Sequence, residues 1–150
     1  MKKILFVCTG NTCRSVMAHY FAAKLAAEDK LFLKFSSAGL SANPGVEIPE
    51  IVKKLLKKVG VKKFTHVPVM LTAKSAESAD LILAMTAAQK ARIAALYPAA
   101  AGKTFTLASF AGLLGGDIPD PYGRGDKFYA ETFALIRSAV KASIEKLKNK

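Results

Sequence analysis

The segment Lys3–Ser15, which reads KILFVCTGNTCRS, decides the fold of this chain. Lys3–Cys8 is apolar on both faces and rich in branched side chains, the pattern of a strand buried in a parallel sheet. A helix is predicted from about Cys13 to Glu28, because Met17, Tyr20, Phe21 and Leu25 share one face. A buried strand that runs directly into a helix is typical of an α/β fold.

The remaining sequence continues this alternation of strands and helices. The patterns predict strands at Leu33–Ser37, Asp80–Met85 and Lys103–Leu107, helices at Pro49–Val59, from the N-cap Thr86 to Leu96 and at Lys127–Lys148, and a long loop at Ala108–Asp126. Gly60 is expected to end the helix at Pro49–Val59. Right-handed crossovers then predict one doubly wound α/β sandwich with a four-stranded parallel sheet in the order 2-1-3-4. No linker divides the chain, so residues 1–150 are expected to form a single domain.

The composition favours a globular protein of the cytoplasm. The 150 residues are 51% hydrophobic and 23% charged, which excludes a disordered chain, and no repeat period indicates a solenoid. No apolar run approaches the roughly 18 residues of a membrane span. The opening Met1–Val7 resembles a signal peptide, but its apolar stretch is too short and no small-residue cleavage site follows.

The net charge of +12 suits anionic partners such as phosphate, nucleic acid or an acidic surface. Six lysines fall at Lys53, Lys54, Lys57, Lys58, Lys62 and Lys63. We interpret this run as the solvated face of one helix and its exit, because no aromatic residues alternate with the lysines to stack on bases. Nucleic acid is therefore not expected as a partner.

The two cysteines, Cys8 and Cys13, indicate chemistry rather than structural cross-linking. Their C-x4-C spacing has no second pair to complete a zinc site, and two cysteines make no disulfide framework. Thiols of a cytoplasmic chain are expected to be reduced.

The turn after the first strand has the composition of a phosphate-binding loop. Gly10 and Asn11 tolerate the positive φ that a tight loop around an anion requires, and the backbone N–H groups of such a loop point inward. The loop comprises Thr9, Gly10, Asn11, Thr12, Cys13 and Arg14, and the guanidinium of Arg14 matches two phosphate oxygens. Cys8 lies at the base, where these groups favour a thiolate nucleophile.

A nucleophile of this kind needs a general acid for the leaving group. The long loop contains Asp117-Ile-Pro-Asp-Pro-Tyr-Gly123, in which two prolines stiffen Asp120 and Tyr122 is placed to line the pocket. Asp117 is the nearest competitor for the role. Solvated turn chemistry is the alternative for either aspartate.

These motifs together resemble the low-molecular-weight protein tyrosine phosphatases. The resemblance rests on Cys8-Thr-Gly-Asn-Thr-Cys-Arg-Ser15, Ser37-Ala-Gly39, Ala79-Asp-Leu-Ile-Leu-Ala-Met85 and Asp120-Pro-Tyr122, which occur in the family's order over the whole chain. It implies hydrolysis of phosphorylated protein side chains through a phosphocysteine, with no metal or cofactor and with inorganic phosphate as product.

The resemblance also implies roles for individual residues. Cys8 is the nucleophile, Arg14 binds phosphate, Ser15 hydrogen-bonds the Cys8 sulfur, and Asp120 is the general acid and base. Asn11, Ser37 and His66 match the network that holds the loop, and Cys13 matches a second cysteine that traps Cys8 as a reversible disulfide. The expected partners are phosphorylated proteins or peptides, met by a monomer or weak dimer.

The chain departs from the family pattern at three places. Val16 replaces the usual proline, and His19 stands where an acidic residue is common. The segment His66-Val-Pro-Val69 lacks the arginine often found after the family's histidine, which leaves a core or capping histidine as the alternative for His66.

The residue type at position 12 distinguishes the two possible substrate classes within this family. Tyrosine-directed members usually carry a bulky aliphatic residue at this position, whereas the bacterial arginine-phosphatase branch carries threonine. A buried guanidine needs hydrogen-bond acceptors, so the sequence favours phosphoarginine slightly, with phosphotyrosine as the alternative. Thr12 is equally placed to cap the following helix.

Three further classes remain as alternatives. A phosphocarrier domain has to preserve its phosphocysteine, which Arg14, Ser15 and Asp120 argue against. A thioredoxin-coupled arsenate reductase needs downstream cysteines, and none follows Cys13. A nucleic-acid-binding module would depend on the lysine run alone.

Overall fold

Strand β1 (Lys2–Cys8) lies in the interior of the sheet between β2 (Leu33–Gly39) and β3 (Leu81–Ala84), and β4 (Thr104–Thr106) pairs with β3. This computed structural model describes residues 1–113 and 115–148. All four strands are parallel and follow the order β2-β1-β3-β4. The predicted α/β sandwich and its strand order are confirmed.

Alternation along β1 divides the core between the two faces of the sheet. Ile4 and Phe6 point into the larger cluster, and Leu5 and Val7 point into the smaller one. Every one of these side chains is almost completely buried, which explains why the strand is apolar at successive positions rather than at alternate ones.

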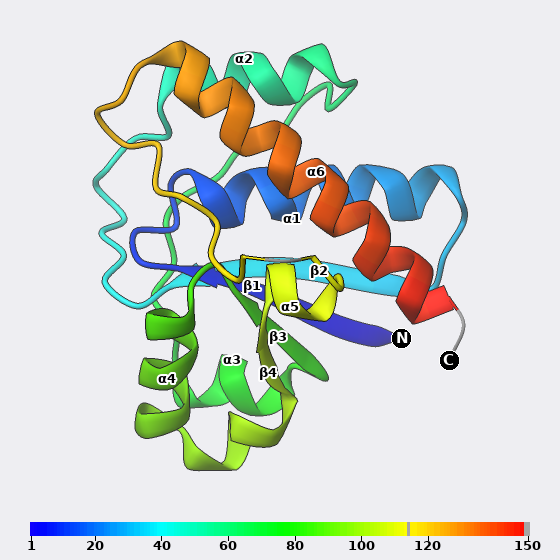
Figure 1. The fold of residues 1–150 in the computed structure, drawn as a ribbon, viewed down its shortest axis with the longest axis vertical. Helices are drawn as coiled ribbons and strands as arrows, with labels where there is room; N and C mark the ends of the chain where they lie inside the picture. The colour runs from blue at the N-terminus through cyan, green and yellow to red at the C-terminus, as the bar shows by residue number, and fades with distance from the viewer. Residues whose placement is uncertain (114, 149–150) are drawn as a thin grey trace.

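Helices cover both faces of the sheet, as Figure 1 shows. One side carries α1 (Arg14–Glu28), α2 (Glu50–Lys58) and α6 (Asp126–Lys148), and the other carries α3 (Ala73–Ser78) and α4 (Ala87–Leu96). Among the described residues, no helix is both long and apolar enough to cross a bilayer.

Helix α2 ends where the glycine predicted it. Gly60 has a φ of 97°, in the left-handed region that favours glycine, and its N–H donates to the carbonyl of Lys57 at 3.0 Å. The N–H of Val61 donates to the carbonyl of Leu56 at 3.0 Å. This pair of bonds is a Schellman motif, which satisfies the last carbonyls of the helix and turns Lys62 and Lys63 away from it.

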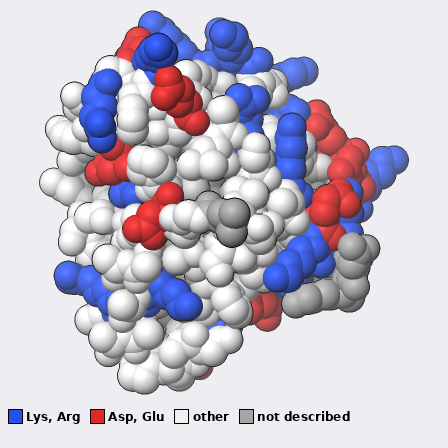
Figure 2. Space-filling view, in the orientation of Figure 1, with Lys and Arg blue, Asp and Glu red and all other residues white. Residues whose placement is uncertain are grey.

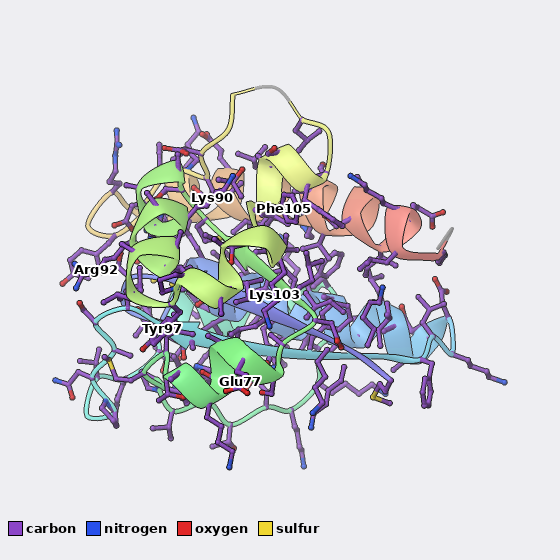
Figure 3. The ribbon with its side chains drawn as sticks, turned by 90° about the horizontal axis from the view of Figure 1, so that it is seen from below. Glu77, Lys90, Arg92, Tyr97, Lys103 and Phe105 are labelled. Carbon is purple, nitrogen blue, oxygen red and sulfur yellow. The ribbon has the colours of Figure 1, made fainter. Side chains whose placement is uncertain are left out.

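Three short helices were not predicted from the sequence. They are α3, a 3-10 helix at Pro98–Lys103 and α5 (Leu107–Phe110), and α5 replaces the predicted end of the fourth strand and start of the loop. Each is too short for a clear apolar period, although Thr72 and Thr106 cap α3 and α5 through their side chains. The Lys103 side chain reaches α3 from the end of the 3-10 helix and donates to the carbonyls of Glu77 and Ala79 (Figure 3).

Candidate active site

The loop that joins β1 to α1, here called the β1–α1 loop (Thr9–Cys13), lies at the carboxyl edge of the parallel strands. Asn11 has the predicted positive φ, of 57°, whereas Gly10 does not, so the expectation for Gly10 was wrong. The loop is packed closely against β2: a Cβ on Gly39 would approach the carbonyl oxygen of Thr9 to 2.6 Å. Only glycine fits at the end of β2.

The Cys8 sulfur has two hydrogen-bond partners, one in the loop and one in the first turn of α1. Its Sγ lies 2.9 Å from the Ser15 hydroxyl oxygen, and the backbone N–H of Asn11 donates to it at 3.3 Å. Cys8 and Ser15 are both buried. Two donors directed at one sulfur stabilise negative charge there, both on a free thiolate and on a departing one.

Asn11 is the centre of the hydrogen bonds that hold the loop. Its side chain is completely buried, and its amide Nδ2 donates to the Ser15 hydroxyl at 2.8 Å. Its Oδ1 accepts from His66 Nε2 at 2.9 Å and from the backbone N–H of Val69 at 3.0 Å. The structure therefore brings Asn11 and His66 together, as the sequence analysis expected.

His66 is held as a neutral imidazole by its surroundings. Because Nε2 donates to Asn11, Nδ1 can act as an acceptor; it lies 2.9 Å from the hydroxyl oxygen of Tyr20, which also lies 3.3 Å from the carbonyl oxygen of Thr65. Burial lowers the pKa of His66. Both ring nitrogens of His66 thus have a polar partner, and the neutral ring adds no positive charge beside the loop.

Ser37, expected in one network with Asn11 and His66, contacts His19. Its hydroxyl lies 2.8 Å from His19 Nδ1, and the ring of His19 stacks on Tyr20 with centroids 4.2 Å apart. Burial lowers the pKa of His19 to about 4, and the neighbouring His66 contributes in the same direction. Among the described residues, Ser37 is thus connected to Asn11 through the stacked rings of His19 and Tyr20 and through His66.

Arg14 and Asp120 meet at the mouth of the loop. The Arg14 side chain is almost fully buried, and its Nη1 donates to the carbonyl of Ile118 at 2.9 Å. Its Nη2 lies 3.9 Å from Asp120 Oδ2, although the Asp120 side chain is 61% exposed. One guanidinium edge is thus fixed to the segment between α5 and α6, beside an accessible carboxylate.

Asp117 serves a structural purpose instead. Its Oδ1 accepts the backbone N–H of Ala87, the first residue of α4, at 2.8 Å. A carboxylate at this place satisfies an unpaired helix N–H and interacts favourably with the positive end of the helix dipole. Of the two candidate acids, only Asp120 forms an ion pair with Arg14.

Gln89 contacts the loop and was missed by the sequence analysis. Its Oε1 accepts the backbone N–H groups of Met85 and Thr86, and its Nε2 donates to the Thr9 hydroxyl at 3.1 Å. The capping box Thr86-x-x-Gln89 is visible in the sequence and would have placed the side chain at the start of α4. The contact with Thr9 needs the tertiary structure.

Three predicted residues remain, Thr12, Cys13 and Tyr122, and they differ in exposure. Thr12 is half-buried, and its hydroxyl does not cap α1, whose N-cap Cys13 makes no side-chain capping bond. Burial raises the pKa of Cys13, whose sulfur lies 3.6 Å from the Tyr129 hydroxyl. Tyr122 is 76% exposed and follows Asp120, whose Oδ1 accepts the Tyr122 N–H at 3.1 Å.

The arrangement combines a buried sulfur nucleophile, hydrogen-bond donors around it, a guanidinium and a carboxylate. These groups suit transfer of a phosphoryl group to sulfur and its later release to water. Over residues 1–113 and 115–148, no cluster of three or more histidine, cysteine, aspartate or glutamate side chains is arranged to hold a metal ion.

Comparisons with known proteins agree with this chemistry. The family model described as low molecular weight phosphotyrosine protein phosphatase matches residues 3–150. The chain is 37% identical to the low molecular weight protein-tyrosine-phosphatase Ptp of Acinetobacter johnsonii over 139 residues, 93% of each chain. It is also 37% identical to the protein-arginine-phosphatase of Bacillus subtilis over 146 residues, which cover 97% of this chain and 96% of the relative.

The fold is similar as well. The crystal structure of a YwlE mutant from Bacillus subtilis superposes with a TM-score of 0.93 at 33% identity, over 99% of both chains.

Proposed function

The chain belongs to the low molecular weight phosphotyrosine protein phosphatase family, and we propose that it hydrolyses phosphorylated protein side chains through a phosphocysteine on Cys8. The observation that carries the proposal is the environment of that sulfur. Cys8 Sγ lies 2.9 Å from Ser15 Oγ and 3.3 Å from the Asn11 nitrogen, and Asp120 lies 3.9 Å from Arg14, which begins the helix after the loop.

In the first step, the backbone N–H groups of residues 9–14 and the Arg14 guanidinium bind the phosphate oxygens. The Cys8 thiolate attacks phosphorus, the bond to the leaving atom breaks, and Asp120 donates a proton to that atom. The negative charge that develops on the equatorial oxygens is stabilised by donors that are already in place.

In the second step, Asp120 takes a proton from water and the water oxygen attacks phosphorus. The sulfur–phosphorus bond breaks, inorganic phosphate forms, and Cys8 returns to the thiolate. The Ser15 hydroxyl and the Asn11 N–H hydrogen-bond the departing sulfur and make it a better leaving group.

We propose phosphoarginine as the preferred substrate and phosphotyrosine as the alternative. Thr12 supports this choice because its hydroxyl does not cap α1. The hydroxyl oxygen lies 3.6 Å from the Cys13 sulfur, to which it can donate while it accepts a hydrogen bond from a guanidine N–H. An aliphatic side chain there would leave that N–H unpaired, at about 1–3 kcal/mol. Both kinds of phosphatase occur among the relatives.

Two measurements test these proposals. Hydrolysis of p-nitrophenyl phosphate, abolished by Cys8→Ser, tests the phosphatase activity, and a wild-type protein without it would contradict the proposal. The ratio of kcat/KM for phosphoarginine over phosphotyrosine peptides tests the substrate. Thr12→Ile should move that ratio strongly toward phosphotyrosine; an unchanged ratio would assign the enzyme to phosphotyrosine.

We further propose that Cys13 protects Cys8 from oxidation. Peroxide converts the Cys8 thiolate to a sulfenic acid, and the Cys13 thiol then condenses with it to a disulfide and water. Without Cys13, a second equivalent of peroxide oxidises the Cys8 sulfenic acid to a sulfinic acid, which dithiothreitol does not reduce. After excess peroxide, activity should therefore return with dithiothreitol in the wild type and not in Cys13→Ser. Equal recovery in both proteins would exclude this role for Cys13.

The proposal extends to the domain organisation, oligomeric state and localisation of the enzyme. We propose that residues 1–150 act as one domain, as a monomer or weak dimer, in the cytoplasm, on phosphorylated proteins. A thiolate nucleophile at Cys8 supports a reducing compartment, in which thiols stay reduced. Sedimentation at several concentrations and fractionation of cells test these points.

A further inference from the structure

A basic hollow lies beside the end of α2. It has a volume of about 580 Å³ and is lined by Lys53, Lys57, Val61, Lys62, Lys63, Phe64 and Thr65. Figure 2 shows basic side chains gathered along the upper edge of the molecule, where Figure 1 places α2. The four lysines are exposed, whereas Val61 forms an apolar floor.

The charge of this hollow is largely uncompensated. Lys53 pairs with Glu50 at 3.2 Å, whereas the ion pairs of the described residues include none for Lys57, Lys62 or Lys63. Compensation of the helix dipole explains a lysine in the last turn of α2. It does not explain Lys62 and Lys63, which follow the turn at Gly60 and are outside the helix.

The basic hollow continues into a second one that approaches the active site. The second hollow, of about 340 Å³, shares Lys53, Phe64 and Thr65 with the first, and its other walls are residues 44–48 and 66–68. We call the two hollows together the α2 groove.

Both walls of the α2 groove lead to the β1–α1 loop. One wall continues from Leu40 and Ser41, whose N–H groups donate to the carbonyls of Cys8 at 3.0 Å and Thr9 at 2.8 Å. The other contains His66, which donates to Asn11 at 2.9 Å. A polypeptide whose phosphorylated side chain occupies the loop therefore has a path along which its flanking residues can extend. This path passes Glu47 and Lys53 in the second hollow before it reaches the unpaired lysines of the first.

We propose that the α2 groove binds acidic residues that flank the phosphorylated side chain of the protein substrate. The inference rests on the proposed function and names the substrate class for the same site. Lysine ammonium groups on flexible stems suit carboxylates at varied positions. Nucleic acid fits less well, because Phe64 packs against Tyr20, with ring centroids 4.6 Å apart, and is not free as a stacking platform.

The test compares two phosphopeptides that differ only in their flanks, one rich in aspartate and glutamate and one in serine and asparagine. The wild type should have a severalfold lower KM for the acidic peptide. Replacing Lys57, Lys62 and Lys63 with glutamine should remove most of that severalfold preference, because three exposed ion pairs are lost. High salt should reduce the wild-type preference in the same way.

A matched variant controls for net charge. Replacing Lys2, Lys34 and Lys74 with glutamine removes the same number of charges from exposed positions outside the α2 groove and should leave the preference intact. An equal loss in this control, or no preference in the wild type, would overturn the proposal. Loss of single-stranded RNA binding in the groove variant, without a change in peptide preference, would assign the surface to nucleic acid.

Two further readouts separate this proposal from the proposed function. All three proteins should hydrolyse p-nitrophenyl phosphate at the same rate, because that substrate has no flanking residues. Calorimetric binding of the two peptides to Cys8→Ser protein measures the groove without turnover. Inactivity on every phosphorylated substrate would contradict the phosphatase; equal affinity for both peptides would contradict the groove.

Discussion

Asp120 and Asp117 lie in the same loop but contact different parts of the molecule. Asp120 is next to Arg14 and exposed, whereas Asp117 caps α4. We expect Asp120→Asn to lower kcat by about 10²–10⁴-fold with a basic leaving group, and by less with p-nitrophenyl phosphate, whose leaving group needs little protonation.

Asp117→Asn is the control, because the amide oxygen can still accept the Ala87 N–H. It should cost at most about 1 kcal/mol in stability and little in rate. Steady-state kinetics of both variants with both substrates checks the assignment. A larger loss of kcat for Asp117→Asn with every substrate would make Asp117 the acid.

The two cysteines should differ in reactivity because their surroundings differ. Donors from Ser15 and Asn11 face the Cys8 sulfur, whereas burial raises the pKa of Cys13 and keeps it a thiol. We expect iodoacetate to alkylate Cys8 rapidly near pH 6 and Cys13 slowly, and phosphate or vanadate to protect Cys8. Mass spectrometry of the labelled peptides distinguishes them; equal, slow labelling of both thiols would exclude an activated Cys8.

At the scale of elements, Gln89 connects α4 and the end of β3 to the β1–α1 loop. It accepts the N–H of Thr86 and shares the N–H of Met85 with the carbonyl of Val7, and it donates to Thr9. Gln89→Ala should therefore destabilise the fold by about 1–2 kcal/mol and weaken inhibition by inorganic phosphate severalfold. Thr9→Val removes only the contact with the loop and should reproduce the change in phosphate inhibition alone.

The double variant tests whether Gln89 acts on phosphate through Thr9. If it does, the effects of the two changes on the phosphate inhibition constant are not additive, because both remove the same hydrogen bond. Full additivity would show that Gln89 affects the site by another route.

At the scale of the whole molecule, His19 makes stability depend on pH. Burial lowers its pKa from 6.5 to about 4, so the unfolded chain binds a proton that the folded chain does not as the pH falls between these values. The wild type should lose up to about 3 kcal/mol from this group between pH 6.5 and 4, with the contribution fully present above that interval.

Urea denaturation of the wild type and His19→Gln at several pH values measures this contribution. The glutamine variant keeps a polar group near Ser37 but does not titrate, so its stability should fall less over that interval. Parallel curves for the two proteins would show that His19 is solvated or already charged in the fold.

The sequence by itself determined the elements with strong local signals. The apolar run of β1, the period of α1 and α6 and the glycine after α2 are properties of neighbouring residues, and the structure confirms each. The strand order 2-1-3-4 also agreed, because right-handed crossovers leave few arrangements for alternating strands and helices. The residues of the β1–α1 loop were also recognisable from the sequence, because Cys8–Ser15 is one contiguous segment.

Tertiary structure decided the contacts between residues that are far apart in the chain. Gln89 and Thr9 are 80 positions apart, and Arg14 reaches a carbonyl 104 positions away. Packing also joined Ser37 to His19 rather than to the Asn11 network directly, and separated the roles of Asp117 and Asp120. The period of apolar residues indicates which face of a helix or strand is buried. The hydrogen-bond partner of a buried polar group depends on which elements pack against each other, and the local sequence does not show this.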